Sequence, residues 1–289
     1  MTRQIYILDQ HLGAVLSIRE DGSGLTVLVD RCPHPDGIVV DGSAGHLYWT
    51  NMGPTFDEPC GSIERARLDG SERTMILAEG LTHTPKQLRL DAAERKIYWC
   101  DREGMRVMRA NMDGTEIETL VITGDPEANR GDATRWCVGI ALDLVRRQVY
   151  WTQKGPPGGG LGRISRTSMD RPNESDAEHQ IEILIENLPE PVDLELSEKG
   201  DSLCWTDRSQ GSGGGSLNRV RVDPASGAIG MPQLVVAEMD EPIGLALNAD
   251  EDRMFVADLG GSVHVGDIER GQWNRLLSNA GRFTGICVL

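Results

Sequence analysis

The chain has 289 residues, a formal net charge of −16 and a sequence pI of about 4.8. A surface this acidic repels the phosphate backbone of a nucleic acid. We therefore expect no nucleic-acid partner. No stretch approaches the roughly 20 apolar residues of a membrane-spanning helix, so we expect no membrane partner either. The length suits one all-β repeat unit, and we expect a single domain over residues 1–289.

The N-terminal segment reads Met-Thr-Arg-Gln-Ile-Tyr-Ile-Leu-Asp, with no long apolar run before the first acidic residue. This does not match a secretory signal, so we expect a cytoplasmic location. The first predicted strands follow at residues 5–8, 14–18 and 25–29. The six cysteines show no Cys-x-x-Cys spacing, which indicates reduced thiols rather than a zinc site.

An aromatic segment recurs along the chain. Four strong copies are Leu-Tyr-Trp-Thr-Asn (47–51), Ile-Tyr-Trp-Cys-Asp (97–101), Val-Tyr-Trp-Thr-Gln (149–153) and Leu-Cys-Trp-Thr-Asp (203–207). Weaker copies lie at residues 5–9 and 254–258. Six copies at intervals of roughly 40–55 residues are typical of propeller blades.

Each repeat divides into four segments, which we interpret as the four strands of a blade. A small, nearly continuous apolar run precedes the aromatic segment at residues 37–41, 87–91, 139–143, 193–197 and 244–248. An alternating segment follows it at residues 63–68, 107–112, 164–169 and 217–222. A turn such as Asp69-Gly70 then leads to a last strand at residues 74–77, 117–121, 181–185 and 233–236. Asp-Gly pairs make tight hairpins, so the strands should run antiparallel.

The two ends of the chain are complementary. The N-terminal repeat lacks a first strand, and the C-terminal residues 284–289 form a first strand without a blade. If this strand joins the N-terminal blade, the ring closes and no sheet edge is left between the first and last blades. The sequence therefore predicts an all-β, six-bladed β-propeller with four antiparallel strands per blade. Alternation places Tyr48 and Trp49 on opposite faces of the blade, where each ring should pack against a neighbouring blade.

The Tyr-Trp-Thr-Asp repeats, followed by Ile/Val-x-Arg and Asp-Gly, resemble the YWTD six-bladed β-propeller of the low-density-lipoprotein-receptor class, over essentially the whole chain. In architecture, size and lack of an export signal, the chain also resembles fungal hetero-Diels–Alderases of tropolonic sesquiterpenoid biosynthesis. That second resemblance implies a catalyst that joins an o-quinone-methide-type diene to an alkene of a humulene-type terpene. The first implies a non-catalytic binding module for a protein or peptide.

Ligand sites of ring-shaped folds gather where loops converge at one mouth of the channel. Alignment of the first strands places a mixed set of side chains there. We assign candidate catalytic roles to His34, Asp36, Lys86 and Arg282. We assign candidate substrate contacts to Met52, Arg102, Trp136, Val138, Val192, Ile243, Phe283 and Thr284.

Each candidate also has a structural interpretation. Asp36 and Lys86 come from adjacent blades and could pair as a salt bridge. His34, in Cys-Pro-His-Pro, could be a surface residue. Trp136 could stack on a ligand or plug the channel. Arg282 could offer a charge-assisted fork to an acidic enol or tropolonate oxygen, or lie on the surface.

The same rim argues against a metal, because apolar residues such as Val138 and Val192 stand where a calcium-dependent propeller needs carboxylates. No phosphate-binding glycine loop opens a helix, so we expect no cofactor. We expect small hydrophobic or semi-polar substrates. The hypotheses are a cofactor-free pericyclase that acts by pre-organisation and hydrogen bonding, and the binding module; the oligomeric state is left open.

Overall fold

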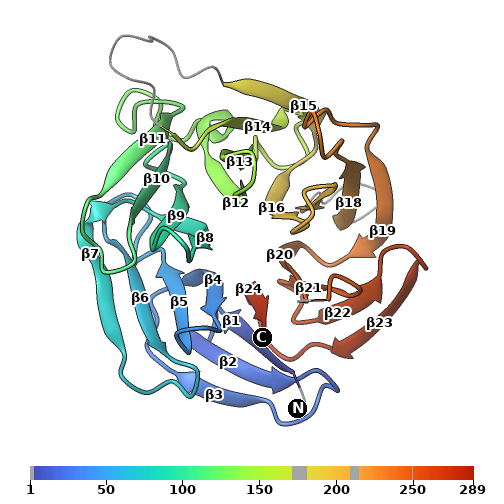
Figure 1. Ribbon diagram of the computed structural model, residues 1–289. Coiled ribbons are helices and arrows are strands. Elements are labelled where there is room, and N and C mark those ends of the chain that lie inside the picture. Colours follow the sequence, from blue (N-terminus) through green and yellow to red (C-terminus); the bar gives the residue numbers. More distant parts are fainter. Residues whose placement is uncertain (1–2, 171–180, 209–214, 249) are drawn as a thin grey trace.

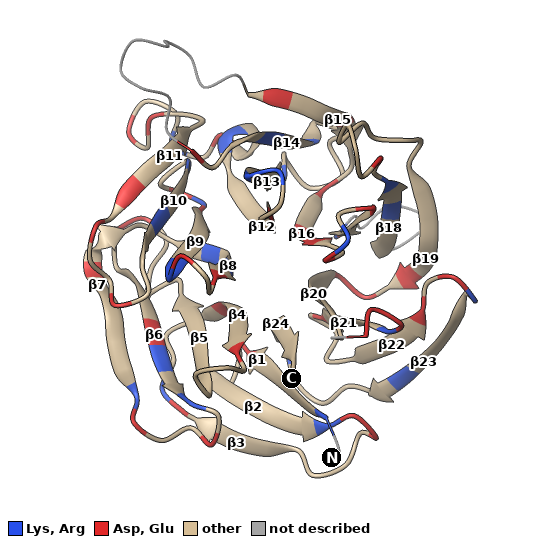
Figure 2. Cartoon of the chain, viewed as in Figure 1, with Lys and Arg blue, Asp and Glu red and all other residues tan. Residues whose placement is uncertain are grey.

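The computed structural model describes residues 3–170, 181–208, 215–248 and 250–289. Six four-stranded antiparallel sheets surround a central channel as the blades of a propeller (Figure 1), which confirms the predicted fold class. Acidic and basic residues are interspersed around the ring rather than sorted onto one side (Figure 2). A three-residue 3-10 turn, η1 (Ala133–Arg135), is the helical element of the described ranges, and none of their helices is long and apolar enough to cross a membrane.

The strands are given from the channel outward. Blade 1 contains β24 (Phe283–Val288), β1 (Gln4–Asp9), β2 (Ala14–Arg19) and β3 (Thr26–Val29). Blade 2 contains β4 (Pro35–Asp41), β5 (His46–Asn51), β6 (Gly61–Arg67) and β7 (Thr74–Thr82). Blade 3 contains β8 (Pro85–Asp91), β9 (Lys96–Asp101), β10 (Arg106–Asn111) and β11 (Glu118–Ile122).

The remaining blades follow the same plan. Blade 4 contains β12 (Cys137–Asp143), β13 (Gln148–Gln153), β14 (Gly162–Ser168) and β15 (Glu182–Leu188). Blade 5 contains β16 (Pro191–Leu196), β17 (Ser202–Asp207), β18 (Gly215–Arg221) and β19 (Gln233–Met239). Blade 6 contains β20 (Pro242–Leu247), β21 (Met254–Asp258), β22 (Val263–Asp267) and β23 (Gln272–Leu277).

The ring closes as the sequence predicts. The C-terminal strand β24 pairs antiparallel with β1, with Ile5 opposite Val288 and Ile7 opposite Ile286. The amide of Leu289 also donates to the carbonyl of Gln4 at 2.9 Å. Both chain ends therefore belong to blade 1, and the innermost strand of that blade comes from the end of the chain (Figure 1).

The aromatic residues fill the interfaces between blades. Tyr98 points into the space between blades 3 and 4 and shares a buried cluster with Trp151 of the next blade. The same arrangement joins Tyr48 to Trp99 and Tyr150 to Trp205. The aromatic segments of blades 2, 3 and 4 therefore contribute one ring to each of their two neighbours, as the alternation predicts.

The threonine of the aromatic segment links blades through hydrogen bonds. Thr152 Oγ1 accepts from the amide of Gly139 in its own blade at 2.7 Å and donates to the carbonyl of Val192 in the next blade at 2.7 Å. Thr50 and Thr206 make the same pair of bonds. These contacts hold neighbouring innermost strands at a fixed distance around the channel.

One basic side chain crosses the channel. Arg89 on β8 donates to the carbonyl of Leu194 at 2.5 Å and to Glu195 Oε2 at 2.9 Å, both on β16. It also lies 3.4 Å from Asp193 Oδ1. Blades 3 and 5 are not neighbours, because blade 4 stands between them. This Arg89 bridge therefore ties together strands on different sides of the channel.

Candidate ligand-binding site

A cavity of about 950 Å³ opens at the face where the innermost strands begin, which we call the entry face. Its walls come from the connection after β5, including Phe56, and from Arg102 at the end of β9. The long connection between β11 and β12 supplies Pro126, Glu127, Arg130, Gly131 and Trp136, and the wall also includes Lys154 and Arg208. Loops of four blades thus converge on one volume, of a size that suits a small organic ligand.

Trp136 stands at the centre of the cationic side chains in this cavity. The Arg102 guanidinium carbon lies 5.3 Å from the centre of the Trp136 ring and 5.0 Å from that of Phe56. Lys154 Nζ lies 5.6 Å from the Trp136 ring. Cations at these distances from an aromatic face are attracted by its negative quadrupole. The cavity therefore combines a flat aromatic surface with two cations, each paired with a carboxylate: Arg102 with Glu103 and Lys154 with Glu190, both at 2.6 Å.

The backbone around η1 fixes the position of Trp136. The Asp132 side chain caps the turn by accepting from the amide of Thr134 at 3.1 Å. The amide of Trp136 donates to the Ala133 carbonyl at 3.3 Å, and its own carbonyl accepts from the amide of Lys154 at 3.2 Å. A side-chain cap and two backbone bonds thus attach the indole to the end of β13.

A buried carboxylate holds two of the cations. Glu190 has no exposed surface, and its Oε1 accepts from Lys154 Nζ at 2.6 Å and from Arg208 Nη2 at 2.7 Å. Burial lowers the pKa of Lys154, and the positive charge of Arg208 lowers it further. Lys154 therefore releases a proton more readily than a solvated lysine, which is useful for a general acid.

Two ring nitrogens that line the cavity have unused hydrogen-bonding capacity. Trp136 Nε1 and His83 Nε2 are buried from solvent, and neither has a hydrogen-bond partner among the described residues. A buried polar atom without a partner costs free energy, so native proteins rarely leave one. Both nitrogens belong to residues of the cavity wall.

Asp36 and Lys86 lie deeper in the channel and pair with each other, one of the two interpretations open at the sequence level. Only 7% of Lys86 and 1% of Asp36 are exposed. Lys86 Nζ also lies 3.4 Å from Met52 Sδ. Burial lowers the pKa of Lys86 to about 8, against the opposing charge of Asp36. The pair joins blade 2 to blade 3 below the entry-face cavity.

His34 adopts a left-handed backbone conformation, with φ of 53°. Its Nδ1 lies 2.8 Å from the carbonyl oxygen of Gly53, and its ring meets that of Phe56 edge-on with centroids 5.4 Å apart. His34 therefore does not line the entry-face cavity itself. It contacts Phe56, which does, and supports the loop that carries this ring.

The other expected residues are dispersed. Val138, Val192 and Ile243 form a buried apolar cluster on one side of the channel. Thr284 Oγ1 donates to the Pro35 carbonyl at 2.9 Å, and Phe283 is fully buried between blades 6 and 1. Arg282 is exposed and lines a separate depression beside Asp9, His11 and Leu12. Of the expected substrate contacts, the structure brings Arg102 and Trp136 together in the cavity.

Comparison with known proteins gives the family. No family model matches the chain. A protein of Pyricularia oryzae named low-density lipoprotein receptor-related protein 1 is 43% identical over 306 residues, which cover 100% of this chain and 98% of that protein. The chain belongs to this family of YWTD propellers.

Two further comparisons agree with this assignment. A Cochliobolus heterostrophus protein named 3-hydroxyacyl-CoA dehydrogenase-like protein LAM1 is 34% identical over 99% of this YWTD propeller, which spans 64% of that relative. A chain in the crystal structure of a nidogen/laminin complex superimposes with a TM-score of 0.75 at 22% identity, over 100% of this chain and 98% of that one. The structural likeness shows the fold alone.

Sequence analysis missed part of the site of this YWTD propeller. Phe56, His83 and Arg130 line the cavity but were not among the candidates. The connection between β11 and β12, residues 123–136, is much longer than the connections that enter the other innermost strands. Its length could have identified it as a functional loop, since long loops in compact domains commonly carry binding residues. His83 had no comparable signal.

Proposed function

We propose that this YWTD propeller is a cofactor-free hetero-Diels–Alderase, which joins an o-quinone-methide-type diene to an alkene of a humulene-type terpene. The observation that carries the proposal is the aromatic face of Trp136, flanked by Arg102 and Lys154, in a cavity of about 950 Å³. A planar ring with acidic oxygens would stack on the indole and present these oxygens to the two cations. The apolar alkene would occupy the remaining volume.

The diene would form in place by loss of water from a hydroxymethyl precursor. Lys154 gives a proton to the hydroxyl of that group as its carbon–oxygen bond breaks, so the group departs as water. The adjacent ring hydroxyl then returns its proton to the Lys154 amine and becomes the carbonyl oxygen of the diene. In the addition that follows, one carbon–carbon and one carbon–oxygen bond form, without gain or loss of electrons or atoms.

The rate enhancement in this mechanism comes mainly from position. Holding two partners in a reactive geometry can remove about 7–11 kcal/mol of the barrier. Arg102 would add to this by stabilising negative charge on the diene oxygen in the transition state. No step needs an external oxidant, and we propose that the protein works in the cytoplasm, where its six unpaired cysteines stay reduced.

The proposal is tested by incubating the protein with a hydroxymethyl tropolone precursor and humulene, and measuring adduct yield and stereoisomer ratio against buffer. We expect Arg102→Gln and Trp136→Leu each to lower kcat/KM on the order of tenfold to a hundredfold. Arg275→Gln, an exposed arginine on the outer strand β23, is the matched control and should retain activity. No acceleration by the wild-type protein would refute the proposal.

The alternative is a non-catalytic module that binds a protein or peptide at the entry face. The name of the Pyricularia oryzae relative, with its reference to a receptor, favours this alternative. So does the exposure of Phe56 (37%) and Leu161 (52%) among loops that follow second strands. Peptide binding that is lost in Phe56→Asp, together with no effect on adduct formation, would support the module over the enzyme.

A further inference from the structure

One blade interface lacks the large rings that fill the others. The position of Tyr48 holds an aromatic residue in five blades: Tyr6, Tyr48, Tyr98, Tyr150 and Phe255. In blade 5 the residue is Cys204. The tryptophan that should meet it from blade 6 is also replaced, by Val256. Both large side chains of the aromatic segments are therefore missing from the interface between blades 5 and 6, where Trp273 of β23 packs against the buried cluster.

The intact interfaces show what surrounds a ring at this position. Tyr150 packs beside Leu196 and Val222 of blade 5. The Arg166 guanidinium carbon lies 5.9 Å from the centre of the Tyr150 ring, and its Nη1 lies 3.4 Å from the phenol oxygen. Arg166 Nη1 also donates to the carbonyl of Gly227, in the outer turn of the next blade.

Blade 3 repeats this arrangement. Tyr98 packs with Leu142 and Met169, and the Arg109 guanidinium carbon lies 6.0 Å from the centre of its ring. Arg109 donates to the phenol oxygen at 3.5 Å and to the Met169 carbonyl at 2.8 Å. Each of these two tyrosines is thus held by two aliphatic side chains and one arginine.

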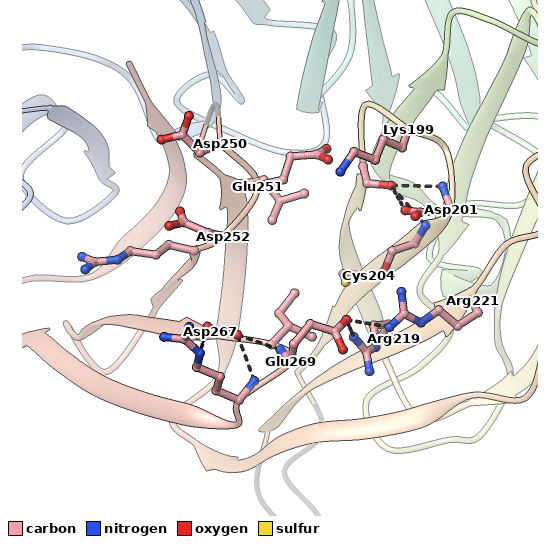
Figure 3. A pocket seen from close by; sticks show the side chains of 16 residues that line it. Lys199, Asp201, Cys204, Arg219, Arg221, Asp250, Glu251, Asp252, Asp267 and Glu269 are labelled. Atoms are coloured by element: carbon pink, nitrogen blue, oxygen red, sulfur yellow. Dashed lines mark hydrogen bonds and ion pairs between the residues drawn. The ribbon is translucent and has the colours of Figure 1, made fainter.

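Between blades 5 and 6 the same surroundings enclose a cavity of about 440 Å³ (Figure 3). Leu247 and Ile268 replace the two aliphatic residues, Arg219 replaces the arginine, and Cys204 lies where the tyrosine begins. Arg219 reaches the outer turn of blade 6, where Glu269 Oε1 accepts from its Nη1 at 2.6 Å. The space therefore includes the volume that a tyrosine ring fills in the other interfaces.

Arg219 also has an unused donor at this place. In blades 3 and 4, the arginine Nε donates to a glutamate on the outer strand, Glu118 at 2.6 Å and Glu182 at 2.8 Å. In blade 5 the outer strand supplies Gln233, which accepts from Arg219 Nη2 at 3.2 Å. Arg219 Nε is buried and has no hydrogen-bond partner among the described residues.

We propose that this blade 5/6 cavity is a second ligand site, for a small molecule with a phenol ring. The ring enters between Leu247 and Ile268 above Cys204, and the phenol oxygen accepts from Arg219 as a tyrosine oxygen does elsewhere. A cavity left by a missing side chain can bind a molecule that replaces it, and here Leu247, Ile268 and Cys204 form the apolar part of a wall that is otherwise polar and charged. The cavity lies at the end of the innermost strands, so it is distinct from the entry-face cavity.

The charged rim of this cavity favours a phenol ligand that carries a polar substituent. Lys199 and Arg221 line the cavity together with acidic side chains such as Asp250 and Glu251 (Figure 3), and Arg253 lines it too. Charges of both signs at the opening can accept an ammonium or a carboxylate attached to the phenol. A para-substituted phenol, with its substituent toward solvent, fits both the buried and the exposed part.

The experiment uses p-cresol as the probe, with binding followed by amide chemical shifts in two-dimensional NMR. We expect saturable shifts at Leu247 and Ile268, and binding of toluene at least tenfold weaker because it lacks the oxygen. Trp136→Leu should leave these shifts unchanged, which separates this site from the entry-face cavity. Absence of the shifts in the wild-type protein would overturn the proposal.

The decisive variant is Cys204→Tyr, which restores the ring of the repeat. It should abolish the p-cresol shifts and raise the melting temperature, because the new side chain fills the cavity. If this variant does not fold, Cys204→Met fills part of the volume with a flexible chain and should weaken p-cresol binding at least fivefold. Unchanged binding in whichever variant folds would refute the proposed location.

Discussion

At the scale of single residues, the threonine of the aromatic segment does more than its small side chain suggests. Its hydroxyl serves two backbone groups at once, one in its own blade and one in the next. In blade 3 a cysteine takes its place, and Cys100 Sγ donates to the Gly139 carbonyl at 3.2 Å. A thiol is a weak donor, so this blade contact is weaker than those made by threonine.

Thr152→Val tests this role. Valine keeps the shape but leaves the Gly139 amide and the Val192 carbonyl without their partner in a buried environment. We expect the free energy of unfolding to fall by about 2–4 kcal/mol, since each unsatisfied group costs about 1–3 kcal/mol. Urea denaturation followed by tryptophan fluorescence measures the change.

Cys100→Thr is the matched control, because it introduces the stronger donor at the equivalent position. Its stability should equal or exceed that of the wild-type protein. A loss in Cys100→Thr as large as that in Thr152→Val would mean that bulk at this position, rather than hydrogen bonding, determines stability.

Residue roles in the site could be predicted only in part. Trp136 stood out because a tryptophan just before an innermost strand breaks the pattern of small residues there. Phe283, which lies one position further along its repeat and was expected to contact substrate, is fully buried between blades 6 and 1. The sequence predicts how far along the channel axis a residue lies. The local twist of the strand determines whether its side chain points into the channel or between blades.

At the scale of elements, the Arg89 bridge joins β8 to β16 through two carboxyl groups in unusual surroundings. Burial raises the pKa of Asp193 to about 6 and that of Glu195 to about 7, although the positive charge of Arg89 opposes both shifts. Asp36 raises the pKa of Asp193 further, and Glu251 does the same for Glu195.

These shifts predict a pH dependence of stability. The folded protein binds protons at Asp193 and Glu195 more tightly than the unfolded chain does. The contribution of these groups is therefore fully present below about pH 4 and is lost as the pH rises to about 7. Glu195→Gln should remove part of this loss, so that its stability relative to wild type improves from pH 4 to pH 8. Urea unfolding across that range measures the difference, and identical pH profiles would contradict it.

Most strands were predictable because the pattern repeats. The innermost and aromatic strands were found in all six blades, since each carries a continuous apolar run or an aromatic pair. The outer strands of blade 6, β22 and β23, were not assigned. Their sequence around His264 and Gly266 lacks the alternating arginine of blades 2 to 5 and the Asp-Gly turn of blades 1 to 3, so only pairing with β21 in the folded chain reveals them.

At the scale of the whole molecule, stability depends on a non-covalent joint. Blade 1 is completed by β24, whose partners on β1 are almost a full chain length away in sequence. Closure removes the free edge that would otherwise expose a row of unpaired backbone groups. The joint also brings Ile286 into the core between blades 6 and 1.

Removal of residues 284–289 tests the joint. The truncated protein should lose its single cooperative unfolding transition and associate through the exposed edge of β1, because non-native pairing would replace the lost strand. Size-exclusion chromatography and thermal melting by circular dichroism measure both effects. Removal of Leu289 alone, a partly exposed residue, is the control. Its elution volume and melting temperature should match those of the wild-type protein. A truncated protein that matched this control would show that closure is dispensable.

The Arg89 bridge has a consequence for how the propeller handles its ligands. The Arg89 guanidinium fixes β8 to β16 across the channel, while the two proposed ligand cavities share no lining residue. Because this bridge restrains the innermost strands, we expect ligand binding in one cavity to cause little movement at the other. The two ligands should therefore bind independently, each with the same affinity whether or not the other cavity is occupied.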